Sequence, residues 1–131
     1  MEQFTDFANG TSTFGDLVRN MYHEYQHLQD GYANPQNKME VHEDEFLSHF
    51  NTLTNTVLPP YSPYYGKVYT QLAEGYYNYI PQAVKDSDPI INNRYGNLVR
   101  SVKKQYGLDP TPNPNQKPPP KKGKISGQIT Y

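Results

Sequence analysis

The sequence contains no cysteine and no tryptophan among its 131 residues. The lack of cysteine excludes disulfides, metal sites built from thiolates, and cysteine nucleophiles. The sequence also lacks an apolar run long enough to cross a membrane, and residues 1–16 are too polar and acidic for a secretory signal peptide. We therefore expect no membrane segment. The compartment stays unknown, and delivery or secretion as part of a larger protein is compatible with these features.

Charge is nearly balanced, with a formal net charge of -1 at pH 7. Proteins that bind nucleic acid usually carry a clear basic excess, so we do not expect nucleic acid as a partner. The aromatic residues are mainly tyrosines, of which there are 13. Tyrosine must therefore supply much of the core, where its hydroxyl groups need water or hydrogen-bond partners.

The hydrophobic spacing predicts a mostly α fold, a small bundle of about four helices with little or no β-sheet. The expected helices cover residues 13–31, 38–57, 64–80 and 87–107. Thr13 is the predicted N-cap of the first helix. From residue 108 onward the chain is rich in proline and lysine. We therefore predict one helical domain over residues 1–107 and a flexible tail over residues 108–131.

One motif in the first predicted helix points directly to chemistry. Residues 23–27 spell His-Glu-Tyr-Gln-His, which is the H-E-x-x-H pattern of zinc hydrolases. His23 and His27 are four residues apart, so both imidazoles lie on one helical face and can bind one Zn²⁺ ion. Glu24 is the candidate general base, because it can take a proton from a metal-bound water.

A catalytic zinc site usually has three protein ligands, so a third is needed. Candidates gather at the start of the second predicted helix, which a helix-loop-helix turn would bring near the first: Glu40, His42, Glu43, Asp44 and Glu45. Glu43 and Glu45 are also explained as solvated acids that suit the N-terminal end of a helix dipole. His49, further along that helix, is expected at a half-exposed position.

The H-E-x-x-H motif followed by Glu40-Val41-His42-Glu43-Asp44 resembles the gluzincin zinc metallopeptidases. It is similar to compact ImmA/IrrE-like domains and to metallopeptidase domains at the C-termini of RHS and polymorphic-toxin proteins. The resemblance implies a zincin-like helical core with Zn²⁺ held by His23, His27 and Glu40. Glu43 and His42 remain alternatives for the third ligand, because Glu43 stands where those families have a small residue.

The resemblance also implies a reaction. Glu24 would act as general base in peptide-bond hydrolysis, and Asp44 would orient a ligand histidine from behind. The substrate would be a peptide or protein, the chain would be the effector domain of a bacterial toxin, and a cognate inhibitor or immunity protein would be a partner. Such families carry strands before the motif helix, whereas only about a dozen residues precede it in this chain.

A second interpretation belongs to another class of protein. The chain would be a non-catalytic helical interaction module of the immunity or adaptor type, with a vestigial or chance H-E-x-x-H. Tyrosine-rich surfaces are well suited to protein interfaces, so the composition is compatible with this interpretation. Metal content separates the two interpretations, and the variant Glu24→Gln separates metal binding from catalysis.

Overall fold

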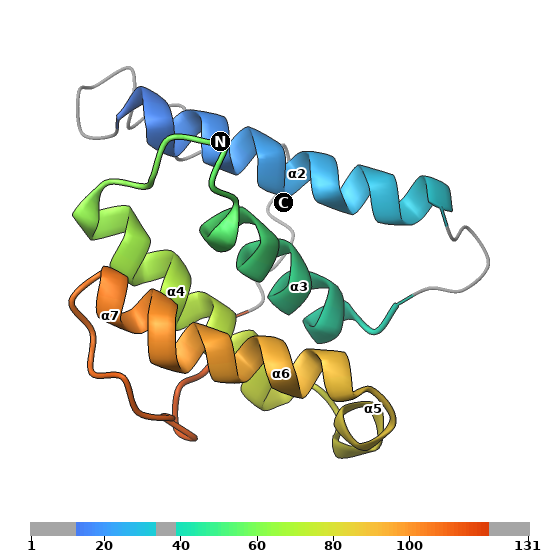
Figure 1. The fold of residues 1–131 in the computed structure, drawn as a ribbon. Coiled ribbons are helices and arrows are strands. Elements are labelled where there is room, and N and C mark those ends of the chain that lie inside the picture. The colour runs from blue at the N-terminus through green and yellow to red at the C-terminus, as the bar shows by residue number, and fades with distance from the viewer. Residues whose placement is uncertain (1–12, 34–38, 121–131) are drawn as a thin grey trace.

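The computed structural model describes residues 13–33 and 39–120, apart from the side chains of residues 30–33, and these residues form helices and no strand (Figure 1). The expected small, mostly α bundle is thus confirmed. α6 (Pro89–Asn97), η1 (Leu98–Val102) and α7 (Lys103–Gln105) follow one another without a break and form one continuous helix with a wider π-type turn inside it. The other elements are α2 (Phe14–Ala33), α3 (Val41–Thr54), α4 (Pro63–Tyr79) and α5 (Gln82–Ser87).

Side-chain caps set the beginnings of the helices. Asp16 N donates to Thr13 Oγ1, and Thr13 N donates to Asp16 Oδ2, both at 3.1 Å, so Thr13 is the N-cap of α2 as predicted. Ser62 accepts a bond from Tyr65 N at the start of α4, and Pro63 follows it in the first helical turn.

The second helix is shorter than predicted. It covers Val41–Thr54 rather than residues 38–57, and Val57 lies outside it and is exposed. Asn55 ends the helix, because its Oδ1 accepts bonds from the backbone N–H groups of Val57 and Leu58 at 2.9 and 3.2 Å. Such a local side-chain bond offers the backbone an alternative to a further helical turn. The short helix α5 was not predicted either.

The core lies where α3 packs against α4 and the α6–η1 helix. Phe46 is completely buried at its centre, and Ala73, Ile91 and Leu98 are equally inaccessible. Gly66 on α4 is required for this packing, because a Cβ there would overlap the Tyr106 ring. The other members of this cluster are Phe50, Leu53, Tyr61, Ile80, Val102 and Tyr106.

Helix α2 lies along α3 at one edge of the bundle (Figure 1) and is attached mainly through polar groups. The buried Arg19 guanidinium donates to the carbonyl oxygens of Thr52, Asn55, Leu58 and Pro59, which lie at the end of α3 and in the loop that follows. These bonds satisfy carbonyl groups that the end of a helix leaves without partners. They position α2 so that its second half faces α3.

The segment that follows α7 packs against α4, although the sequence predicts a flexible tail from residue 108. Asn78 Nδ2 donates to the carbonyl oxygens of Asn113 and Gln116 at 2.8 and 3.0 Å. The backbone of Lys117 passes so close to Gly75 that a Cβ on that glycine would overlap it. Residues 121–131, the rest of the predicted tail, lie outside the described residues.

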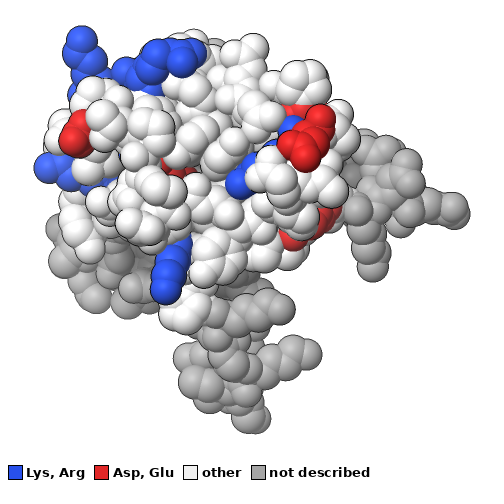
Figure 2. Space-filling view, turned by 90° about the horizontal axis from the view of Figure 1, so that it is seen from below, with Lys and Arg blue, Asp and Glu red and all other residues white. Residues whose placement is uncertain are grey.

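The charge on the lower face of the molecule is mixed. Figure 2 shows lysine, arginine, aspartate and glutamate side chains standing singly or in small groups between wide uncharged areas. Among the described residues on that face there is no extended patch of one sign. None of the described helices combines the length and apolar character needed to cross a membrane.

Candidate metal centre

Two facing pairs of side chains form a cluster between α2 and α3. His23 and His27 come from α2, and Glu45 and His49 come from α3, and the members of each pair are four positions apart in the chain. We call these four residues the α2–α3 cluster. His27 Nε2 lies 3.0 Å from His23 Nε2 and 2.9 Å from Glu45 Oε1. Glu45 Oε2 lies 3.6 Å from His23 Nε2, so three donor groups meet at one point.

His49 forms the inner side of this cluster. It is buried, and its Nε2 lies 3.8 Å from Glu45 Oε2. The His49 ring lies 4.2 Å from the His23 ring and stacks on Tyr69 and Tyr76 of α4 at 5.7 and 5.6 Å. Ligand atoms of His23, Glu45 and His49 all lie within 4.8 Å of one another. The geometry therefore suits a single metal ion.

The electrostatics of the cluster are strongly coupled. Burial alone would lower the pKa of His27, but its contacts with Asp44 and Glu45 outweigh burial and raise it to about 10. Burial would raise the pKa of Glu45, but hydrogen bonds with His23 and His27 hold it well below its usual range. Burial lowers the pKa of His49 well below its usual value, and the neighbouring His23 adds to this. His49 is therefore neutral, the form that binds metal.

Asp44 lies behind His27. Its Oδ2 is 2.9 Å from Nδ1 of His27, which leaves Nε2 directed at the centre of the cluster. A carboxylate in this position fixes the orientation of a ligand imidazole and makes it more basic. The contact is of the kind that the resemblance to gluzincins implied for Asp44.

One ring atom of the cluster lacks a partner. His23 Nδ1 is buried and accepts or donates no hydrogen bond among the described residues. A buried polar atom without a partner costs about 1–3 kcal/mol and calls for an explanation. The cluster is thus not arranged for maximal stability of the metal-free protein.

The other sequence candidates lie differently. Glu40 caps α3 by accepting a bond from Glu43 N at 2.9 Å, and its other oxygen lies 2.8 Å from His42 Nδ1. The His42 ring packs near Tyr79 and not within the cluster. Glu43 is half-buried, and Glu24 is exposed on α2, beside His23 in the chain. The structure therefore brings Glu45 to the histidines, where the resemblance would place Glu40.

The prediction of a half-exposed His49 is wrong, because α4 covers this face of α3. A sequence signal for the pair did exist. Glu45 and His49 are separated by the same four-residue step as His23 and His27, and this step is what two ligands on one helix need. The acidic residues around Glu45 are also explained by the helix dipole, because negative charge suits the first turns of a helix. The Glu45–His49 spacing was therefore not interpreted as a pair of ligands.

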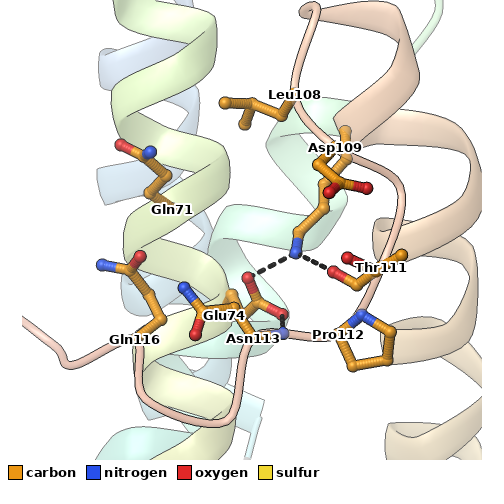
Figure 3. A pocket seen from close by; sticks show the side chains of 9 residues that line it. Gln71, Glu74, Leu108, Asp109, Thr111, Pro112, Asn113 and Gln116 are labelled. Atoms are coloured by element: carbon orange, nitrogen blue, oxygen red, sulfur yellow. Dashed lines mark hydrogen bonds and ion pairs between the residues drawn. The ribbon is translucent and has the colours of Figure 1, made fainter.

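A second buried polar group lies away from the cluster, between α4, α7 and the segment after it (Figure 3). Lys103 Nζ contacts Glu74 Oε1 at 2.6 Å and donates to Thr111 O at 2.5 Å. Glu74 Oε2 accepts bonds from Tyr95 Oη at 2.6 Å and Asn113 N at 2.9 Å. We call this group the Glu74–Lys103 pair. It borders a cavity of about 300 Å³.

No protein-family model, curated protein or solved structure matches this chain.

Proposed function

We propose that this chain binds one Zn²⁺ ion between α2 and α3 and uses it to hydrolyse peptide bonds. The observation that carries the proposal is the convergence of four donor side chains from two facing helices on one point. Imidazole and carboxylate groups without thiolates are the ligands of catalytic rather than purely structural zinc sites. The H-E-x-x-H motif adds a carboxylate, Glu24, at the position of a general base.

We assign His23, His27 and Glu45 as the ligands, with Asp44 orienting His27. Their donor atoms lie 2.9 to 3.6 Å apart, the closest set in the cluster. His49 packs beneath them as a neutral imidazole. Three protein ligands leave one position for water, as hydrolysis requires.

The zinc ion would lower the pKa of a bound water to about 7 and polarise the scissile carbonyl. Glu24 would accept the proton of that water and then deliver it to the leaving amine. Glu24 is exposed, so it is accessible to a substrate from solvent. The substrate class we propose is a peptide or an unfolded protein segment, which would reach this exposed surface.

The first experiment measures zinc in the purified protein by elemental analysis after incubation with excess metal. We expect about one zinc per chain, and its loss in His23→Ala/His27→Ala and in Glu45→Gln. His42→Ala and Glu40→Gln are matched controls, because His42 and Glu40 contact each other outside the cluster. Wild-type protein without zinc, or zinc lost in Glu40→Gln and kept in Glu45→Gln, would contradict this site.

The second experiment separates catalysis from binding. Glu24→Gln should retain zinc and lose cleavage of a mixture of denatured proteins, measured by mass spectrometry of the new N-termini. The expected loss is about 100-fold or more, the usual contribution of a positioned general base. Cleavage that persists in Glu24→Gln, or that is absent from zinc-loaded wild type, would contradict the peptidase proposal while leaving the zinc site intact.

One observation favours a second candidate function, a zinc-stabilised interaction module. His49 is a fourth donor in the same cluster, and four protein ligands would close the coordination sphere to water. In that case His49→Ala should abolish zinc binding as completely as His23→Ala. If His49→Ala keeps stoichiometric zinc, the open three-ligand site is favoured.

A further inference from the structure

Helix α2 presents several large apolar side chains to solvent and mainly polar side chains to the rest of the protein. Its buried residues are the polar Asp16, Arg19 and His23 and the apolar Leu17, and Asn20 makes hydrogen bonds with Tyr61 and Tyr69. An ordinary surface helix turns its apolar stripe toward the core, whereas Leu17 is the one buried apolar side chain among those described on α2. The outer side of α2 therefore needs its own explanation.

The outer side carries a continuous apolar stripe. Met21, Tyr25 and Leu28 are exposed by 60, 51 and 59%, and the half-buried Val18 extends the row toward the N-terminus. Because an α-helix turns about 100° per residue, these four positions fall within about 80° of arc. The stripe therefore follows helical spacing and faces outward.

The spacing within the stripe is that of a helix-helix seam. Val18, Met21, Tyr25 and Leu28 follow one another at steps of three, four and three residues. This is the a/d pattern along which two helices interlock. Methionine and tyrosine are also enriched in the centres of protein interfaces. A stripe of this pattern is complementary to a second copy of itself.

Charge around the stripe favours a protein partner over a membrane surface. Helices that lie on membranes carry lysine and arginine beside their apolar face. Among the described side chains of α2, the basic residue Arg19 is buried on the opposite side, and the exposed charge is the acid Glu24. The described side chains on the exposed side of α2 therefore provide no positive charge to attract an anionic lipid surface.

We propose that this stripe, Val18, Met21, Tyr25 and Leu28, is the docking surface for a second copy of the chain, which contributes its own α2. These side chains can bury on the order of 400 Å² per copy, about half of the usual share of a stable interface. The dimer is therefore weak and concentration-dependent. Its contacts lie on the side of α2 opposite His23, so dimerisation and metal binding are separate properties.

The test is sedimentation equilibrium of the full chain from micromolar to millimolar concentration. We expect the wild type to reach the mass of a dimer within this range and Met21→Lys to remain monomeric throughout. The matched control is Ile90→Lys, which changes an equally exposed apolar residue on α6. It should dimerise like the wild type. Circular dichroism of each variant checks that the helices are intact.

Several outcomes would overturn the proposal. A wild type that is monomeric at millimolar concentration excludes the second copy. A dimer that survives Met21→Lys uses another surface. A monomer that sediments with neutral or anionic lipid vesicles, and loses this with Met21→Lys, assigns the stripe to a membrane. A monomer whose thermal stability drops with Met21→Lys and not with Ile90→Lys assigns it to a segment of the same chain.

Discussion

The α2–α3 cluster and the Glu74–Lys103 pair are both groups of buried ionisable side chains, but they differ in how fully their polar atoms are bonded. Both oxygens of Glu74 have partners, and Lys103 has two, with distances of 2.5 to 2.9 Å. In the α2–α3 cluster, His27 contacts His23 at 3.0 Å and Glu45 at 2.9 Å, but the buried His23 Nδ1 has no partner among the described residues.

The difference indicates what each group is for. A buried ion pair whose atoms are all bonded holds chain segments together, and the Glu74–Lys103 pair joins α4 and α7 to the segment at Thr111 and Asn113. A cluster that leaves a buried polar atom without a partner loses stability at that atom unless a ligand completes it. The α2–α3 cluster is of this second kind. Substitutions in the Glu74–Lys103 pair should therefore lower stability and leave metal binding intact. Substitutions in the α2–α3 cluster should weaken metal binding and have a smaller effect on the stability of the metal-free protein.

The largest expected effect on stability is in the Glu74–Lys103 pair. Lys103→Met would leave the Glu74 carboxylate buried without its cation, which should lower the free energy of unfolding by about 3–5 kcal/mol. Urea unfolding followed by circular dichroism measures this. Lys104→Met is the control, because Lys104 is exposed, and it should change stability by less than about 0.5 kcal/mol. Equal effects of both variants would show that the pair is not structural.

The α2–α3 cluster should respond in the opposite way. His49→Leu replaces a neutral imidazole packed against Tyr69 and Tyr76, so zinc-free stability should change by about 1.5 kcal/mol or less. With zinc at 100 times its Kd, the wild type should gain about 2.7 kcal/mol. Glu45→Gln should lose this gain, and Lys103→Met should keep it. Thermal unfolding with zinc and with a chelator distinguishes these results.

Much of the fold follows from local rules that the sequence makes visible. Thr13 is an N-cap with Asp16 three residues later, and Pro63 and Pro89 stand in first helical turns, so these starts were predictable. The end of α3 depended on bonds made by the Asn55 side chain. Asparagine forms such bonds in some contexts and not in others, so the sequence alone did not place this end.

The candidate site also has one part that the sequence makes recognisable and one part that depends on tertiary packing. His23 and His27 are recognisable because both lie within one motif on one helix. Glu45 was among the acids that the sequence offered, but the choice between Glu40 and Glu45 depends on which face of α3 meets α2. That face is set by long-range contacts, such as the bonds from Arg19 to the loop after α3. The packing of 108–118 on α4 depends on Gly75, whose role is equally invisible in sequence.

A smaller effect tests the role of Asp44 in the cluster. Asp44→Asn keeps the shape of the side chain but removes the charge 2.9 Å from His27 Nδ1. We expect zinc affinity to fall about 10–100-fold, the usual cost of losing a carboxylate behind a ligand histidine. Competition with a fluorescent zinc chelator measures the affinity. Glu43→Gln is the control on the same helix turn, and if it weakened binding as much, general charge rather than orientation would be responsible.

The smallest effect concerns the pH dependence of the zinc-free protein. The raised pKa of His27, about 10 against 6.5, contributes stability that is complete below pH 6.5 and lost as pH rises through 10. The lowered pKa of Glu45 contributes stability that is complete above pH 4.5 and lost as pH falls below it.

The stability difference between the wild type and His27→Gln should therefore be greatest between pH 4.5 and 6.5, and it should shrink toward pH 10. We expect a difference of about 1–2 kcal/mol in that window, because the contacts of His27 are charge-assisted but only partly shielded from water. Urea unfolding with a chelator present, repeated from pH 4 to 10, measures it. A difference that does not vary with pH would mean that the His27 contacts with Asp44 and Glu45 are not ionic in the metal-free protein. The cluster would then resemble the neutral packing around His49, and its affinity for zinc would no longer be limited by the displacement of a proton from His27.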